Sequence, residues 1–480
     1  MAKLFVFGIG GTGSRVLKSL TMLLASGVDL NGYELVPIII DPDAANGDLT
    51  RTVEMLKGYQ EIRKEMDFAL HPNTGFFNTP LEQISTNFRL ELQDTRNEVF
   101  RDFIGFSTLS TANQALASML FSEDNLQSDM EVGFKGNPNI GAVVLNQFNE
   151  NEDFQKFAAA FSKGDRIFII SSIFGGTGAA GFPLLLKNIK NADQTLPTWA
   201  LLKEAPIGAL TMLPYFGVWP DEKSKIDKAT FISKTKAALS YYDSNITGNR
   251  SLNALYYLGD ALTKDYENHE GAVYQKNDAH FLELLGALSI VDFAATPDTA
   301  LQNQEGRAIN PVYKEYGLHQ EAERIGFQHL GPLTSQQIQA GLSKYLFFTL
   351  YLKNHLQDAL DMPWATGRVK IDRVFLSGAF YNQYLRNFNT AFLEWLTEMK
   401  RNKRSFAPFN LKVSNRNLFE VIEGLKPKKG LFERGSSYKR IDYLLSKVEP
   451  KIKAEQQAAK FMTLFDLALS QLIKEKYNFK

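Results

Sequence analysis

The chain has 480 residues, with 44% hydrophobic and 22% charged side chains, which is typical of a globular protein of more than one domain. It contains no cysteine, which excludes disulfide frameworks, thiolate nucleophiles and cysteine-based zinc or iron–sulfur sites. No apolar run reaches the roughly 18 residues of a membrane span, and the first residues lack the pattern of a signal peptide. The predicted location is the cytoplasm.

The net charge of zero hides a division along the chain. Residues 368–480 contain 23 basic and 11 acidic side chains, a net charge of +12, whereas the 30 basic and 42 acidic residues before them give −12. Opposite charge on two parts of a molecule favours head-to-tail self-association or an anionic partner. An uneven surface without function is the alternative.

Short apolar runs predict a parallel β-sheet in the first part of the chain. The run 4–7 ends at Gly8 and is followed by apolar residues at helical spacing, and a second run, 35–40, ends at Asp41. This order of strand, turn, helix and strand is a βαβ unit. Further runs predict strands at 166–173, 209–213 and 254–258.

Later segments predict a buried helix and a second structural unit. The stretch 280–293 is apolar on most helical faces, as in a helix at the centre of a fold. The runs 374–379 and 409–413 predict strands, and 453–476 predicts a terminal amphipathic helix.

Two glycine-rich turns carry the chemistry of the sequence. Each follows a predicted strand and precedes a predicted helix, where glycine lets the backbone approach a phosphate and the helix start presents N–H groups to it. Two such turns can hold one polyphosphate from two sides. The residues that we expect to bind phosphate are Gly8, Gly10, Gly11, Thr12, Gly13, Ser14 and Arg15 in the first turn, and Gly175, Gly176, Thr177 and Gly178 in the second.

Four segments resemble, in the expected order, the tubulin/FtsZ superfamily of GTP-binding proteins. GIGGTGSR resembles the first phosphate loop of FtsZ, and IIIDPDAANGD resembles the strand and loop that follow it. GFKGNPNIG is similar to the loop that wraps the terminal phosphate, and FIISSIFGGTGAAGFPLLL resembles the tubulin signature loop on its strand and helix. The strand and loop IGALTMLPYF also fit this order.

The resemblance implies further site residues. Gly136 and Asn137 would lie at the terminal phosphate, and Asp41 or Asp43 near a Mg²⁺ ion bridging phosphate oxygens. Tyr274 would stack on guanine, with Asp278, or Asn277 as the alternative, bonding the edge of the base. No metal site made of protein ligands alone is expected.

The sequence also departs from the family pattern. Phe174 stands where the signature loop usually has a third glycine, and Arg15 stands where FtsZ has an asparagine that helps hold the nucleotide. Asp292 is the candidate for the first acid of the catalytic loop, which completes the GTPase site of a neighbouring subunit, but Ala295 occupies the position of the second acid. Hydrolysis is therefore expected to be weak or assembly-dependent, if present.

The resemblance implies an α/β fold with three parts. These are a Rossmann-like GTP-binding domain over 1–275, a central helix over 276–296 and a smaller C-terminal α/β domain over 297–480. It implies GTP or GDP with Mg²⁺ as ligands and head-to-tail filaments of the chain itself, with adaptor proteins as further partners. The basic clusters at 400–404 and 426–430 favour a solvated surface over direct nucleic-acid binding, since no helix-turn-helix accompanies them.

Two other functions stay open at this point. The first glycine turn followed by Asp41, Asp43 and Arg51 also resembles ThiF-type enzymes, which bind ATP and adenylate their substrates. A non-hydrolysing scaffold or switch that holds a nucleotide is the third interpretation. His280 and Glu283 share one helical face and are expected to form a buried, hydrogen-bonded pair rather than a metal site.

Overall fold

The computed structural model describes residues 1–43, 45–72, 75–93, 95, 98–130, 134, 137–218, 228–260, 265–266, 276–315, 322–428 and 437–479. Its centre is a six-stranded parallel sheet with the order β10-β6-β4-β3-β1-β2. The five predicted strands of the first part of the chain are confirmed, and β10 joins them at one edge. The strands are β1 (Lys3–Ile9), β2 (Glu34–Ile40), β3 (Arg166–Ser172), β4 (Ile207–Met212), β6 (Ala254–Leu258) and β10 (Val312–Glu315).

The order of the strands reverses at β1. From β1 the chain first builds β2 on one side, and it then builds β3, β4 and β6 on the other. In open parallel sheets, ligands bind beyond the carboxyl ends of the strands at the point where this reversal occurs. That point lies between β1 and β3, the two strands that precede the glycine turns.

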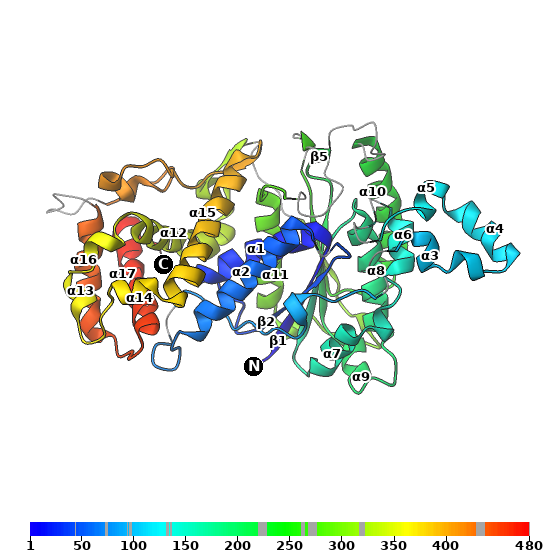
Figure 1. Ribbon diagram of the computed structural model, residues 1–480, viewed down its shortest axis with the longest axis horizontal. Coiled ribbons are helices and arrows are strands. Elements are labelled where there is room, and N and C mark those ends of the chain that lie inside the picture. Colours follow the sequence, from blue (N-terminus) through cyan, green and yellow to red (C-terminus); the bar gives the residue numbers. More distant parts are fainter. Residues whose placement is uncertain are drawn as a thin grey trace.

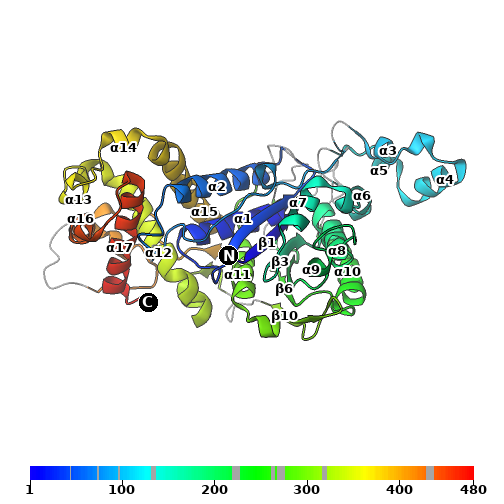
Figure 2. The ribbon, with the colours of Figure 1, turned by 90° about the horizontal axis from the view of Figure 1, so that it is seen from below.

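Helices cover both faces of the sheet. Figures 1 and 2 place α1 (Gly10–Ala25), α2 (Gly47–Lys64) and α11 (Phe281–Ala295) between the sheet and the C-terminal helices, and α8 (Gly176–Lys190) with α10 (Lys228–Tyr242) on the opposite side. Every residue of α11 is buried except Asp292 and Ala295, which confirms the predicted buried helix. α6 (Pro138–Val144) packs against α8, and α7 (Glu152–Ala160) and α9 (Trp199–Lys203) also lie on that side.

The described part of the chain after residue 322 is mainly helical. Its strands pair only as β11 (Arg324–Ile325) with β12 (Ser405–Phe406). The predicted terminal helix is confirmed as α17. The helices are α12 (Pro332–Asn354), α13 (Pro363–Thr366), α14 (Arg373–Ser377), α15 (Arg386–Arg401), α16 (Ser437–Val448) and α17 (Gln457–Tyr477).

Two predicted strands are wrong. The run 374–379 lies in α14 and in the two residues that lead to the π-helical turn Phe380–Leu385, because the Asp372 side chain caps a helix by accepting from the Phe375 N–H at 3.0 Å. The run 409–413 forms one isolated bridge, between Phe409 and Ile422. β10 belongs to the large sheet, so residues after 297 also contribute to it.

A small helical projection extends away from the body of the molecule. It consists of α3 (Phe100–Phe103), α4 (Thr111–Leu120) and α5 (Glu123–Leu126), at the end of the long axis opposite the C-terminal helices (Figures 1 and 2). Among the described residues, no helix combines the length and the apolar character that crossing a membrane requires.

Candidate functional site

Two helices begin at the switch point of the sheet without a cap. α1 starts at Gly10 after β1, and α8 starts at Gly176 after β3. Neither N-terminus has a side-chain cap or an acidic residue in its first turn. The free N–H groups and the positive ends of both helix dipoles therefore favour an anion at this place.

The neighbouring helices α2 and α11, in contrast to α1 and α8, have capped N-termini. The side chain of Asn46 caps α2 and accepts from the Asp48 N–H at 2.8 Å, and Asp48 lies in its first turn. His280 and Glu283 form a capping box at the start of α11, in which the His280 N–H donates to Glu283 at 2.9 Å. The predicted buried His280–Glu283 pair is thus confirmed, and its role is to close the end of a helix.

The two glycine turns lie beside each other, and within each turn the start of the helix packs tightly on the end of its own strand. Gly10 has a φ of +70°, and a Cβ built on it would lie 3.6 Å from the Cβ of Thr177. A Cβ on Gly13 would lie 2.4 Å from the carbonyl carbon of Gly8, and one on Gly178 would lie 2.6 Å from the carbonyl oxygen of Ser172. Glycine is therefore required for each helix to start so close to its strand.

A third predicted segment also reaches this region. α6 begins after Asn137, whose side chain accepts from the Asn139 N–H at 3.1 Å. A Cβ on Gly141 would lie 3.0 Å from the carbonyl oxygen of Gly176, so α6 packs directly on the start of α8. Gly136 lies outside the described residues.

Asp41 and Asp43 follow β2, one strand away from the first turn. Ile40 pairs with Ile9, so Asp41 leaves its strand beside Gly10. Burial of Asp41 raises the pKa of its carboxyl group to about 7, although the Asp43 N–H donates to it at 3.1 Å. No group of three or more acidic or histidine side chains among the described residues is arranged to hold a metal.

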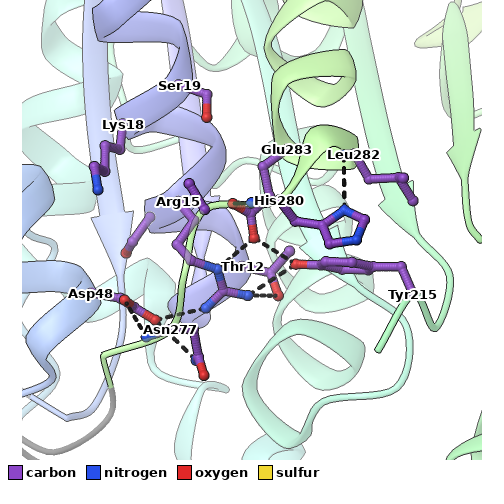
Figure 3. A network of polar contacts seen from close by, with 12 residues as sticks. Thr12, Arg15, Lys18, Ser19, Asp48, Tyr215, Asn277, His280, Leu282 and Glu283 are labelled. Atoms are coloured by element: carbon purple, nitrogen blue, oxygen red, sulfur yellow. Dashed lines mark hydrogen bonds and ion pairs between the residues drawn. The ribbon is translucent and has the colours of Figure 1, made fainter. Parts of the chain in front are cut away.

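Arg15 lies at the centre of a buried polar network beside the first turn (Figure 3). Its Nε donates to Glu283 at 2.6 Å, one Nη donates to Asp48 at 2.7 Å and the other to the Tyr215 hydroxyl at 2.9 Å. Burial alone would lower the pKa of Arg15, but Tyr215, Glu283 and Asp48 together raise it well above its ordinary value. The side chain of Arg15 is only 5% exposed, so its charge is neutralised inside the protein.

The network continues into the C-terminal helices through Arg51. One Nη of Arg51 donates to Asp48 at 2.6 Å and the other to Glu398 of α15 at 2.7 Å. Glu398 also accepts from Lys18 at 3.2 Å. We call these six side chains the ion network: Arg15, Lys18, Arg51, Asp48, Glu283 and Glu398.

The predicted base-binding residues are partly engaged by protein groups. Asn277 donates through its backbone and its side chain to Asp48, at 3.1 and 3.2 Å, and Asp278 pairs with Arg401 at 3.0 Å. Tyr274 lies outside the described residues. Contact of Asn277 or Asp278 with guanine, and of Arg15 with phosphate, therefore stays a prediction.

Phe174 occupies the position of the missing third glycine without entering the turn. Its ring packs against those of Tyr215 and Phe216, with centroids 6.2 and 5.6 Å apart. The ring is 4% exposed and lies in the core beside the second turn.

Asp292 lies at the far end of α11 from the glycine turns. At about 1.5 Å per residue, it is roughly 16 Å along the helix from Phe281. It accepts hydrogen bonds from the Tyr256 hydroxyl at 2.6 Å and from Lys314 at 2.5 Å. Asp292 therefore does not meet the turns of its own chain, and its catalytic role stays a prediction.

No protein-family model and no curated protein matches the chain. Partial likeness is found to solved structures of tubulin-like proteins at low TM-scores. CetZ2 from Haloferax volcanii, a GTPγS-bound protofilament, is 14% identical, with 62% of this chain and 61% of that chain covered and a TM-score of 0.31. CetZ1 from the same organism, a GDP-bound monomer, is 14% identical, with 54% and 51% covered and a TM-score of 0.28.

A GTPγS-form protofilament of TubZ from Bacillus thuringiensis serovar israelensis is 13% identical, with 83% and 82% covered and a TM-score of 0.27. The chain thus spans less than two thirds of either CetZ structure. Similarity at this level assigns neither ligand nor activity to the chain.

Proposed function

We propose that the chain is a tubulin/FtsZ-like protein that binds GTP or GDP at the carboxyl ends of β1 and β3. The observation that carries the proposal is the pair of uncapped helix starts, Gly10 and Gly176, at the switch point of the sheet. A polyphosphate on these N–H groups would satisfy both helix ends at once. The tubulin-like order of the sequence segments supports guanine as the base.

Mg²⁺ fits this site as a companion of the phosphates. Asp41 and Asp43 are the carboxylates beside the first turn, and Mg²⁺ is commonly held by one or two carboxylates together with phosphate oxygens and water. Two carboxylates alone do not complete a Mg²⁺ site, so phosphate oxygens and water would supply its other ligands. The ion would neutralise phosphate charge there.

We further propose that copies of the chain associate head to tail. Asp292 lies at the end of α11 away from the glycine turns, so in a head-to-tail pair it would face the turns of the next subunit. Its partner Lys314 and the alanine at position 295 both weaken a catalytic role, and we therefore propose slow hydrolysis. The division between the basic residues 368–480 and the acidic remainder supports attraction between copies.

The test is light scattering by the purified protein at increasing concentration, with GTP, GDP, ATP or no nucleotide, while phosphate release is followed in parallel. Scattering that requires GTP and begins above a threshold concentration is the expected result. Phosphate release that rises with assembly would assign hydrolysis to the contact between copies.

Other outcomes select other functions. Tight GTP binding without scattering would indicate a nucleotide-bound scaffold or switch. Binding of ATP with no response to GTP would overturn the proposal in favour of an adenylating enzyme. In that case Arg51 would need to leave Asp48 and Glu398 to reach a ligand.

A further inference from the structure

A cavity lies away from the glycine turns, among the C-terminal helices. Its volume is about 860 Å³, within the range of small-molecule sites. One face of α15 forms its longest side, and α12, α14, the turn Phe380–Leu385, Gln357, Lys276 and Asp278 also contribute to it. Arg51 and Glu398 line it as well, so the cavity borders the ion network. We call this cavity the α15 groove.

The groove has more free positive than free negative charge. Lys276, Lys353 and Arg386 line it, are exposed, and form no ion pair with any residue that the structure describes. Its acidic residues are mostly engaged, since Asp278 pairs with Arg401 at 3.0 Å and Glu398 with Arg51 at 2.7 Å. Glu394 is the lining acid without an ion pair among the described residues. The groove therefore favours an anion.

One wall residue also has an unused hydrogen-bond donor. Asn389 lines the groove and is 6% exposed, and its side-chain oxygen accepts from the Tyr345 hydroxyl at 2.8 Å. Its buried side-chain nitrogen has no hydrogen-bond partner among the residues that the structure describes. A buried donor without a partner is unfavourable.

Part of the remaining lining is apolar or aromatic. Leu352, Leu376, Leu393 and the ring of Tyr381 line the groove, and all four are at least partly buried. Apolar surface beside a few placed polar groups is typical of sites for organic ligands. An inorganic ion would leave this apolar surface without a partner.

We propose that the α15 groove binds a small organic anion with an apolar body. Lys353 and Arg386 attract its acidic group, and the leucines and Tyr381 cover its body. The site is separate from the glycine turns, because none of their residues lines it. Lys353 and Arg386 are not among the proposed nucleotide contacts, so the proposal does not depend on the proposed function, although Asp278, which is predicted to bond guanine, also lines the groove.

The test uses 8-anilinonaphthalene-1-sulfonate, an aromatic sulfonate, as the probe on the full chain. Fluorescence titration and equilibrium dialysis with saturating GTP present, and again without it, give affinity and stoichiometry. We expect a site that persists with GTP and that Lys353→Glu and Arg386→Glu each weaken by about tenfold or more, because each places a repelling charge at the groove. Both side chains are exposed, so the variants should fold, which thermal melting checks.

Lys439→Glu is the matched control, since it makes the same charge change at an exposed position of α16 outside the groove. It should bind the probe as the unchanged protein does. The uncharged analogue N-phenyl-1-naphthylamine should bind more weakly than the sulfonate. The proposal is overturned if the sulfonate does not bind, if Lys439→Glu weakens it equally, or if the uncharged analogue binds equally well.

Discussion

At the residue scale, the ion network gives Arg15 a structural role that its position in the first glycine turn does not indicate. Arg15, Asp48 and Glu283 have side chains that are 5% exposed or less. Burial of each charge alone would be strongly unfavourable, so the three depend on one another. Through this network Arg15 joins α1 to α2 and α11, whether or not it also contacts a ligand.

Arg15→Ala should therefore destabilise the fold strongly. The substitution leaves the carboxylates of Asp48 and Glu283 short of a buried counter-charge, and we expect a loss of about 3–5 kcal/mol in the free energy of unfolding. Urea denaturation measures it. Arg368→Ala is the control, because its pair with Glu455 is 75% and 81% exposed and should contribute less than about 1 kcal/mol. Equal effects of the two substitutions would contradict the buried network.

Asp41 predicts a dependence of stability on pH. Its pKa is about 7 in the folded chain against an ordinary 3.8, so the unfolded chain loses this proton first as the pH rises. Below about pH 4 the carboxyl of Asp41 is protonated in both states and does not reduce the free energy of unfolding. Between about pH 4 and pH 7 the unfolded chain ionises first, so the free energy of unfolding falls as the pH rises. Asp41→Asn should thus match the unchanged protein near pH 4 and exceed it at pH 8, by about 4 kcal/mol at most.

Denaturation at several pH values between these limits tests this expectation. Asp361→Asn, at an exposed position, should show no such divergence. Suppose that the free energy of unfolding of Asp41→Asn differs from that of the unchanged protein by the same amount near pH 4 and at pH 8. That result would contradict a buried carboxyl with a raised pKa.

At the element scale, the starts of α1 and α8 depend on close contact between backbones. The turn before α8 leaves no space at Gly178, because a Cβ there would lie 2.6 and 2.8 Å from the backbone oxygen and nitrogen of Ser172. Neither of these atoms can move without moving β3. The position of the helix start therefore depends on this glycine.

Gly178→Ala should displace the second turn and weaken nucleotide binding. Strain of about 1–3 kcal/mol corresponds to a loss of roughly tenfold to a hundredfold in affinity for GTP. Isothermal titration calorimetry measures it. Gly331→Ala is the control, since a Cβ there meets nothing within 4 Å. If Gly178→Ala binds GTP as tightly as Gly331→Ala does, the α8 turn is not part of the site.

The elements near the sheet could be predicted from the sequence, but the contacts that join distant elements could not. Residues 254–258 were predicted as a strand and form β6, because apolar, β-branched or aromatic runs between turns are local signals. The strand predicted at 374–379 failed because Asp372 caps a helix there, a local signal that its apolar run concealed.

The candidate site likewise has a part that the sequence predicts and a part that it does not predict. The glycine turns have a pattern that can be recognised within a few residues. Arg15 and Glu283, in contrast, are 268 positions apart, and Arg51 and Glu398 are 347 apart. Nothing close to Arg15 in the sequence indicates which acid will neutralise it, so a phosphate contact was the natural expectation.

At the scale of the whole molecule, charge is unevenly distributed along the chain. Residues 368–480, in the C-terminal part, are basic, and the residues before them are acidic. Attraction between such parts of two copies acts through solvent and is screened by salt. If it drives association, the strength of assembly depends on ionic strength.

Raising NaCl from about 0.1 M to about 1 M shortens the screening length from roughly 10 Å to 3 Å. We expect the threshold concentration for GTP-dependent scattering to rise several-fold. GTP affinity measured on the dilute, unassembled protein is the control and should change less. Polymers that form equally well at both salt concentrations would contradict an electrostatic contact between copies.

The ion network also has a consequence for the order in which the protein is made. Lys18 and Arg51 leave the ribosome early, whereas Glu398, which pairs with both, is synthesised 347 residues after Arg51. At about 5–20 residues per second, the early cations wait roughly 17–70 seconds for that carboxylate. Lys18 on α1, whose ion pair among the described residues is with Glu398, therefore lacks its counter-charge until α15 emerges, and Arg51 has only Asp48. We expect nascent chains that end before α15 to stay incompletely folded and to depend on chaperones during this interval.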